Sequence, residues 1–408
     1  MALIQEENIM NIPYEQLDPK AALKVYCDWI MEQLPRFQNP PFEWYFLFYP
    51  IRTLLMGARI LNCKEYAEAT WPFLDNYVAE QLPNGALTSN FRGQPAATMS
   101  QKDIEVLLRN GKLNLADNGS NVHGLLQAAV TMADDEHRER YLAAAKKWLD
   151  CWVPIWALPD GSYGNGIWCG HKLNGPYSMA MNVCSAFAAY SIITGEDHYI
   201  ENAEGFAMFQ CDHWHPCGAP IRYNLYPLPS NDTLCGDYSR IFYLMEGLVW
   251  THYASKNQEV KDRIASRLTE WFEKELINRW PEDRGWFNMN RASIKYKGEE
   301  LIDPATGIKY TCSSSDARFY WQSSKCCAIP HLYSYYLNHI DDRADMRSMF
   351  ERGGMYLSNP LKARMLGVMA DDVVPDFCMQ ATGFAGLTVA EAAEPDSCFK
   401  AYTEGTEA

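Results

Sequence analysis

The stretch that decides the fold is Asn118-Gly-Ser-Asn-Val-His-Gly-Leu-Leu-Gln-Ala-Ala-Val-Thr-Met132, followed by Glu136-His-Arg-Glu-Arg-Tyr-Leu-Ala-Ala-Ala-Lys-Lys-Trp-Leu-Asp-Cys-Trp152. The first segment reads as a helix that is apolar on nearly every side, which is typical of a buried helix. The second has one charged face and is therefore expected at the surface. Only residues 133–135 separate the two segments. Such a short link makes neighbouring helices antiparallel, so we expect a hairpin of one inner and one outer helix.

The same alternation repeats along the whole chain. Apolar helices are expected at 44–61, 118–132, 177–194, 239–254, 317–338 and 377–392. Amphipathic helices are expected at 21–34, 64–80, 136–152, 198–209, 258–277 and 342–356. Six buried helices that alternate with six half-exposed ones predict an all-α fold, a single-domain (α/α)6 toroid. We place this barrel at residues 1–393 and expect a short, loose C-terminal tail at 394–408.

The links between these helices have unequal lengths. Links from an inner to an outer helix are short: 62–63, 133–135, 195–197 and 255–257. Links from an outer to an inner helix are long: 81–117, 154–176, 210–237 and 278–316. In a toroid all the long links emerge at the end where the inner helices begin. Long loops on a rigid scaffold carry binding and chemistry, so this end is the predicted active face. A helical-repeat scaffold for protein binding stays open as another interpretation, although solenoid repeats rarely carry such long loops.

The amino-acid composition limits the classes of molecule that the protein is expected to bind. The 408 residues carry a formal net charge of −15, which disfavours nucleic acid and anionic membrane surfaces. The 13 Trp, 24 Tyr and 17 Phe could supply stacking surfaces for a small-molecule or oligosaccharide substrate. The polar N-terminus leads us to expect no secretory signal, although a mature secreted chain stays open, and the 13 scattered cysteines show no paired metal-ligand spacing. We expect a cytoplasmic protein with no metal and no cofactor, and the oligomeric state stays open.

Three aspartates stand directly before expected inner helices: Asp117, Asp237 and Asp316. Each could be an N-cap that merely stabilises its helix. Each could also present a carboxylate to the central cavity as a general acid, a general base or a nucleophile. We predict that Asp117 and Asp237 are catalytic, with Asp117 as the protonated partner and Asp237 kept ionised by the nearby Arg240, and that Asp316 contacts substrate.

Further candidates surround these aspartates. Arg240 follows Asp237 by three residues and could hold a substrate carboxylate or form an internal ion pair. His171 ends the glycine-rich loop 158–171 and could shuttle a proton, or it could be a solvated turn residue. We predict His171 as catalytic. The predicted substrate-contacting set comprises Arg240, Trp44, Tyr45, Asn121, Trp168, Tyr238, Asp316, Tyr320 and Trp321.

Two stretches carry a resemblance to a known family. The stretch Ala116-Asp-Asn-Gly-Ser-Asn-Val-His-Gly-Leu-Leu126, followed by the helix at 136–152 and then Asp160-Gly-Ser162, is similar in order and spacing to the six-hairpin glycosidases. The same similarity is carried by residues 186–190 and the stretch Thr194-Gly-Glu-Asp-His-Tyr199 that follows them. Among these enzymes the chain most resembles unsaturated rhamnogalacturonyl and unsaturated glucuronyl hydrolases. The resemblance implies an (α/α)6 barrel, a uronic-acid or related glycan as substrate, and Asp117 as the family's aspartate on the second inner helix.

The resemblance also has a departure. The family's proton-donor aspartate on the third inner helix has no match, since that region reads Gly175-Pro-Tyr-Ser-Met-Ala-Met-Asn182. We therefore expect a glycoside hydrolase or lyase with carboxylate acid/base catalysis, and keep other users of such a ring open. These include sugar 2-epimerases and an isomerase, dehydratase or cyclase that resembles linalool dehydratase-isomerase and acts on an apolar alcohol. A polar site favours a sugar, whereas a dry aromatic site favours a terpenoid.

Overall fold

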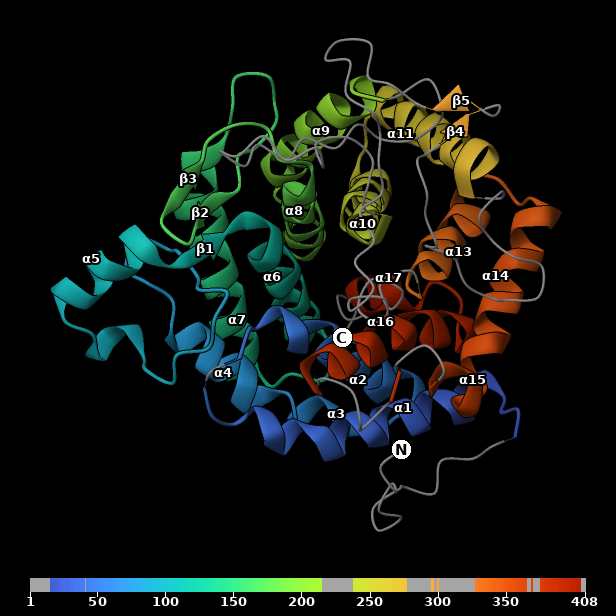
Figure 1. Cartoon of the computed structure of the whole chain (residues 1–408), viewed down its shortest axis with the longest axis horizontal. Coiled ribbons are helices and arrows are strands. Elements are labelled where there is room, and N and C mark those ends of the chain that lie inside the picture. The colour runs from blue at the N-terminus through green and yellow to red at the C-terminus, as the bar shows by residue number, and fades with distance from the viewer. Residues whose placement is uncertain are drawn as a thin grey trace.

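The computed structural model describes residues 15–40, 42–214, 238–276, 295–296, 299–300, 327–364, 368–369 and 375–404. Its helices form two concentric layers around one axis (Figure 1). The inner helices are α2 (Tyr45–Leu61), α6 (Leu115–Val130), α8 (Asn182–Thr194), α10 (Tyr238–Ala254), α13 (Ile329–His339) and α16 (Pro375–Ala393). Each contacts the next in this order, and α16 closes the ring against α2. The (α/α)6 toroid that the sequence predicts is confirmed.

The outer layer consists of α1 (Pro19–Gln33), α3 (Lys64–Glu68), α4 (Trp71–Ala79), α7 (Asp135–Lys147), α9 (Asp197–Asp212), α11 (Gln258–Trp271) and α14 (Ala344–Leu357). Short helical turns extend or join these elements: η1 (Leu34–Phe37), η2 (Ala96–Thr98), η3 (Trp148–Trp152), η4 (Val153–Trp156), η5 (Ser178–Met181), η6 (Phe272–Leu276) and α15 (Pro360–Arg364). The core lies between the two layers, where Trp29, Trp148 and Trp271 are fully buried, and it continues inside the ring, where Trp250 of α10 packs against His123 and Tyr402.

Glycines let the inner helices approach one another closely. A Cβ atom on Gly383 of α16 would lie 2.3 Å from the backbone nitrogen of Pro50 in α2. A Cβ on Gly119 of α6 would lie 2.7 Å from the carbonyl carbon of Asn182, at the start of α8. Both distances are far below van der Waals contact, so at these crossings the backbones themselves touch. Larger residues at these positions would force the ring apart.

Some helix bounds differ from those expected. The expected helix 64–80 is split into α3 and α4, because Pro72 occupies the first turn of α4, where a helix starts readily. The expected helix 177–194 begins as the 3₁₀ turn η5 before it becomes α8. Of the expected helix 317–338, only the part from residue 327 lies within the described residues.

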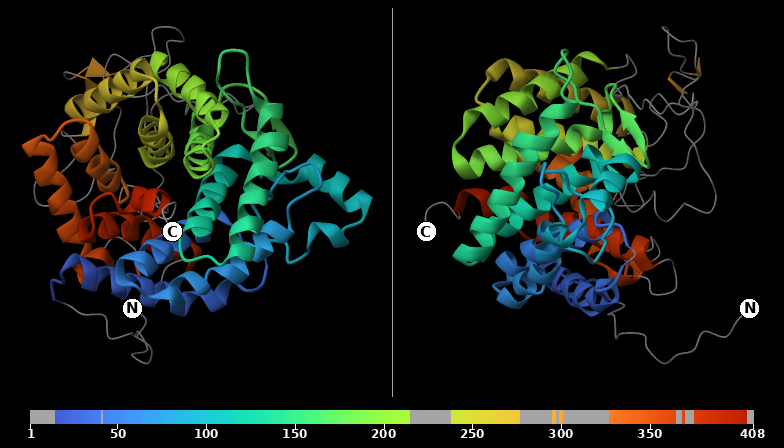
Figure 2. Two further views of the ribbon diagram at one scale, coloured as in Figure 1. Left: turned by 180° about the vertical axis from the view of Figure 1, so that it is seen from behind. Right: turned by 90° about the vertical axis from the view of Figure 1, so that its left-hand side faces the viewer.

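Two long links meet in a small sheet. Strand β1 (Lys112–Asn114) ends the link before α6 and follows α5 (Gln101–Asn110), while β2 (Gly166–Trp168) and β3 (His171–Leu173) belong to the link before α8. The three strands pair antiparallel in the order β1-β2-β3, and a separate pair is formed by β4 (Lys295–Tyr296) and β5 (Glu299–Glu300). The right-hand view of Figure 2 shows the three-stranded sheet at one end of the ring axis.

The C-terminal segment is ordered, so the expectation of a loose tail from residue 394 is wrong for residues up to 404. Residues Ser397–Glu404 form helix α17, which contacts α2, α6, α8 and α16. Cys398, Phe399 and Tyr402 are buried on one face of α17. Helix α17 lies at the opposite end of the axis from the three-stranded sheet (Figure 2). No helix among the described residues is long and apolar enough to cross a membrane.

Candidate active site

Asp117 lies in the first turn of α6, at the end of the ring where the long links gather. The prediction that Asp117 caps this helix is wrong, because α6 begins at Leu115 and its N-cap is Asn114. The physical reason lies in Asn165 of the following long link. Its backbone carbonyl accepts a hydrogen bond from the Leu115 amide (3.1 Å), and its side-chain Oδ1 accepts one from the Ala116 amide (2.9 Å). These bonds satisfy amides that a helix start leaves without partners, so the helix extends past Asp117.

The backbone at Asp117 is held from two sides. Asn165 binds the Ala116 amide, and Asn182 Nδ2, from the first residue of α8, donates to the Ala116 carbonyl at 2.9 Å. Asp117 itself is half-buried, and its Oδ2 atom is inaccessible to solvent. The positive end of the helix dipole favours a negative charge in this first turn. The result is a half-buried carboxylate on a backbone segment whose position is fixed.

Buried amides lie behind this carboxylate. Asn118 Nδ2 donates to the carbonyls of Leu87 (3.1 Å) and Asn114 (2.9 Å), while its Oδ1 accepts from the Tyr77 hydroxyl at 2.8 Å. Asn121, one turn further into α6, is fully buried and donates to Asn118 Oδ1 at 3.4 Å. These amides fix the first turn of α6 against the loop that precedes it.

A lysine and a tryptophan of the three-stranded sheet stand near Asp117. The Lys112 ammonium pairs with Glu43 and lies 4.7 Å from the centre of the Trp168 ring. Burial disfavours the charged form of Lys112, but the hydrogen bond and charge of Glu43, together with the charge of Asp117, outweigh burial and raise its pKa. Lys112 therefore stays positively charged between two carboxylates.

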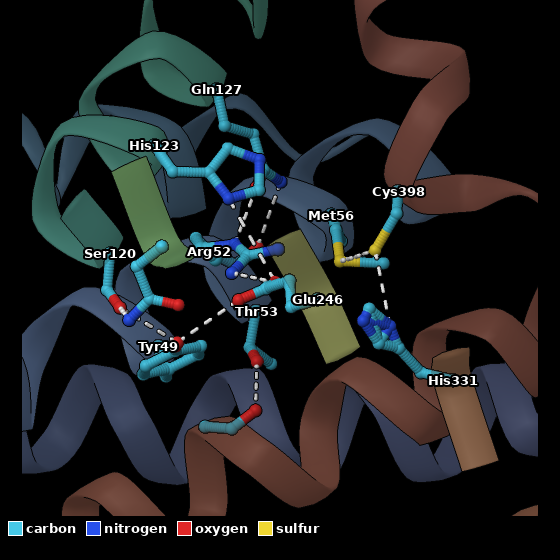
Figure 3. A network of polar contacts seen from close by, with 12 residues as sticks. Tyr49, Arg52, Thr53, Met56, Ser120, His123, Gln127, Glu246, His331 and Cys398 are labelled. Atoms are coloured by element: carbon cyan, nitrogen blue, oxygen red, sulfur yellow. Dashed lines mark hydrogen bonds and ion pairs between the residues drawn. The ribbon is translucent and has the colours of Figure 1, made fainter. Parts of the chain in front are cut away.

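Below this end, a charged pair fills the centre of the ring (Figure 3). Arg52 Nη1 of α2 binds Glu246 Oε1 of α10 at 2.6 Å, and each side chain is only 1% exposed. The Tyr49 hydroxyl donates to Glu246 Oε2 at 3.2 Å and shares a 3.0 Å hydrogen bond with Ser120. Removing either charge of such a pair leaves the other buried without compensation, which is strongly destabilising. We interpret this cluster as the polar core that ties α2, α6 and α10 together.

Two buried histidines flank the charged pair. His123 Nδ1 lies 3.9 Å from Glu246 Oε1, and its ring meets Trp250 edge-on at 4.4 Å. Burial, with a smaller contribution from Arg52, keeps the pKa of His123 well below its usual value. The same two causes lower the pKa of His331 to about 3, and its Nδ1 lies 3.7 Å from Cys398 Sγ. Both imidazoles are therefore neutral packing groups at ordinary pH.

This polar core is not among the features predicted from the sequence. A signal was available, since Arg52 and Glu246 each stand between apolar residues in the middle of a mostly apolar helix. A charge at a buried position needs a partner, so two such residues on inner helices could have been paired. What the sequence could not show is that α2 and α10 face each other across the ring.

The other predicted site residues fall into three groups. Trp44 needs correction: it is 0% exposed, packs against Phe42 and Phe91, and donates from Nε1 to Glu80 at 3.3 Å, so it is a core residue rather than a substrate contact. Tyr45, Trp168 and His171 are at least partly exposed. Asp237, Asp316, Tyr320, Trp321 and the side chains of Tyr238 and Arg240 lie outside the described residues. Among the described residues no group of three or more His, Cys, Asp or Glu side chains could hold a metal ion.

Comparison with known proteins identifies the fold. No family profile matches the chain, and no curated protein sequence matches it either. Several solved structures do match its fold. Dfg5 from Chaetomium thermophilum, in complex with glucosamine, has a TM-score of 0.57 at 11% identity and covers 94% of this chain and 93% of its own. A polysaccharide lyase has a TM-score of 0.54 at 10% identity, covering 91% and 98%.

The family that the sequence resembles is also among the matches. The unsaturated glucuronyl hydrolase from Bacillus sp. GL1 has a TM-score of 0.53 at 10% identity, covering 83% of this chain and 84% of its own. The chain has the six-hairpin glycosidase fold. At this identity the likeness establishes the fold that glycoside hydrolases and lyases share, and leaves the chemistry to be argued from the residues of the chain itself.

Proposed function

We propose that this protein is a carbohydrate-active enzyme, a glycoside hydrolase or lyase that acts on a uronic-acid-type or related glycan. The observation that carries the proposal is the half-buried carboxylate of Asp117, on a backbone segment that Asn165 and Asn182 fix at the end of the ring where the long links gather. Lys112, whose charge interacts with Asp117, can bind sugar hydroxyls, and the neighbouring Trp168 can stack on a sugar ring. Pre-organised polar groups of this kind support acid/base chemistry.

The surroundings of Asp117 suggest its role. The helix dipole and the positive charge of Lys112 both stabilise an ionised carboxylate. Asp117 is therefore proposed as the general base, the nucleophile or the stabiliser of positive charge in the transition state. Asp237, directly before α10, is proposed as the proton donor, which reverses the roles expected from the sequence, where Arg240 keeps Asp237 ionised and Asp117 is the protonated partner. Arg240 is proposed to hold the substrate's carboxylate.

A second function has an observation in its favour. Tyr49, Phe242, Tyr243 and Phe384 pack against one another on the inner faces of α2, α10 and α16, with the Tyr49 and Phe384 ring centres 4.1 Å apart. All four side chains are buried, so the interior of the ring is dry and aromatic here, which is the surrounding that an apolar substrate would favour. The alternative is thus an isomerase, dehydratase or cyclase that acts on a terpenoid-like alcohol.

One screen separates the two functions. The purified protein is incubated with unsaturated uronyl oligosaccharides, with polysaccharides that contain uronic acid, and with terpenoid alcohols, and the products are identified by mass spectrometry. We expect cleavage of a uronide and no change in any alcohol. Conversion of an alcohol alone would establish the alternative. If no compound is converted, the proposal fails in favour of a binding or scaffold protein.

We also propose that the protein is cytoplasmic. Nine cysteines lie among the described residues, and all nine are free thiols, six of them buried. Free buried thiols suit a reducing compartment. Fractionation of the source cells, with the protein followed by antibody, tests this location.

A further inference from the structure

Three side chains form a row across the three-stranded sheet. In its register Lys112 of β1 lies opposite Trp168 of β2, and Trp168 lies opposite His171 of β3. Residues directly opposite in antiparallel strands point to the same face, with Cβ atoms about 4.5–5.5 Å apart. The three residues of the row are partly or fully exposed, whereas Leu113 and Ile167 in the adjoining register are buried. The row therefore presents an ammonium, an indole and an imidazole on one open face.

The row is held rigidly. Trp168 and His171 flank a two-residue turn in which Cys169 and Gly170 both have left-handed backbone angles, with φ of 48° and 85°. Positive φ at both positions is typical of the type I′ turn, which fits the twist of a hairpin. A Cβ on Gly170 would lie 3.2 Å from the Arg109 carbonyl, so the turn packs against the end of α5. The indole is thus presented by a hairpin with a fixed position.

The polar groups of the row complement a sugar ring. The Lys112 ammonium donates hydrogen bonds, its partner Glu43 accepts them, and both side chains are partly open, at 22% and 25% exposure. Side by side, such a pair can bind two adjacent hydroxyl groups of one sugar, with the ammonium as donor and the carboxylate as acceptor. The Lys112 ammonium lies over one face of the indole, so the C–H groups of the same sugar ring would stack on the other face. His171, at the far side of the indole, can donate to or accept from another hydroxyl.

The row also adjoins the candidate catalytic group. Lys112 stands five positions before Asp117, and Asn165, directly before β2, binds the Leu115 and Ala116 amides that precede Asp117. The charges of Asp117 and Lys112 also interact. We propose that Lys112, Glu43, Trp168 and His171 form a subsite for a second sugar residue, next to the residue that Asp117 acts on. The substrate is then an oligosaccharide or a polysaccharide rather than a single sugar with a small leaving group. This inference rests on the proposed function for the role of Asp117.

Binding and catalysis can be tested separately. The variant Asp117→Asn, which is expected to bind without turnover, is applied to a glycan array that carries the monosaccharide and the disaccharide of several acidic and neutral series. We expect the disaccharide of at least one series to bind about tenfold more tightly than its monosaccharide. Adding Trp168→Ala should remove this difference, as expected for the loss of one aromatic contact. Trp168→Phe, which keeps a ring, should retain most of it.

Lys172→Ala serves as the matched control. Lys172 is exposed on the same strand as His171, but successive residues of a strand point to opposite faces, so this variant should bind like its parent. Melting temperatures that match the parent's show that the hairpin is intact. Equal binding of monosaccharide and disaccharide, no effect of Trp168→Ala, or no binding to any glycan would overturn the subsite. If Asp117→Asn binds as described but remains fully active, the catalytic assignment fails while the subsite stands.

Discussion

The buried carboxyl group of Glu391 holds helix α17 in place and should make stability depend on pH. Glu391 Oε1 accepts hydrogen bonds from the Cys398 amide (2.8 Å) and the Ser397 hydroxyl (3.0 Å), which together begin α17. Its Oε2 lies 3.4 Å from the Ser334 hydroxyl of α13. Burial disfavours the charged form more than these hydrogen bonds favour it, and the pKa of Glu391 rises from 4.5 to about 7.

This shift fixes both the sign and the size of the effect. The folded protein holds the proton more tightly than the unfolded chain, so Glu391 contributes stability that is fully present below about pH 4.5. That contribution is lost as the pH rises through 7. At about 1.4 kcal/mol per pKa unit, the loss amounts to about 3 kcal/mol. Glu391→Gln should mimic the protonated form, because its amide oxygen can accept the two bonds from α17 and its amide nitrogen can donate to Ser334.

The assay is urea unfolding of both proteins between about pH 5 and pH 8, followed by fluorescence. We expect the variant to have nearly the wild-type free energy of unfolding at the acid end and to exceed it by about 3 kcal/mol at pH 8. Glu394→Gln is the control. Glu394 is half-buried. Burial alone would raise its pKa, but hydrogen bonds and ion pairs with Lys400 and Arg59 outweigh burial and lower the pKa. That variant should show no such gain at pH 8. A stability difference between Glu391→Gln and wild type that does not change with pH would refute the reasoning.

Two further predictions concern the centre of the ring, and urea unfolding measures both. Arg52→Met should lower the free energy of unfolding by about 3–5 kcal/mol, because Glu246 is left buried without its partner. Adding Glu246→Leu should restore most of this loss. A double variant as unstable as the single one would contradict this. Gly383→Ala should cost about 1–3 kcal/mol or more, because its Cβ would lie 2.3 Å from Pro50 N. Gly205→Ala, where the nearest atom is 3.9 Å away, should be neutral or stabilising, and equal effects at the two glycines would disprove the close-contact argument.

The ring could be predicted because its pattern is local and repeated. An inner helix must be apolar on nearly every side and an outer helix on only one, so each hairpin can be predicted from its own segment of the sequence. The observed α2 and α10 begin within one residue of the expected 44–61 and 239–254. The split of the outer helix at Ala69 and Thr70 was also signalled locally, by Pro72, but the amphipathic pattern continues across the break and conceals it.

The candidate site was harder to predict, because its geometry depends on contacts between distant segments. The position of Asp117 in α6 depends on Asn165, which stands 49 residues after the amide of Ala116 that it binds. The polar core depends on Arg52 meeting a residue 194 positions away. Helix α17 is different, since the apolar spacing of Cys398, Phe399 and Tyr402 was available in the sequence and favoured a docked helix.

We propose above all that the carboxylate of Asp117 takes part in cleaving a glycan. This is tested by comparing kcat/KM of Asp117→Asn with that of the wild type on the uronide that the screen identifies. Asparagine keeps the shape of the side chain and removes its capacity for proton transfer or nucleophilic attack. The account predicts a kcat/KM about 10²–10⁴-fold lower, with an unchanged melting temperature. A variant that cleaves the same glycan at the wild-type rate would contradict the account.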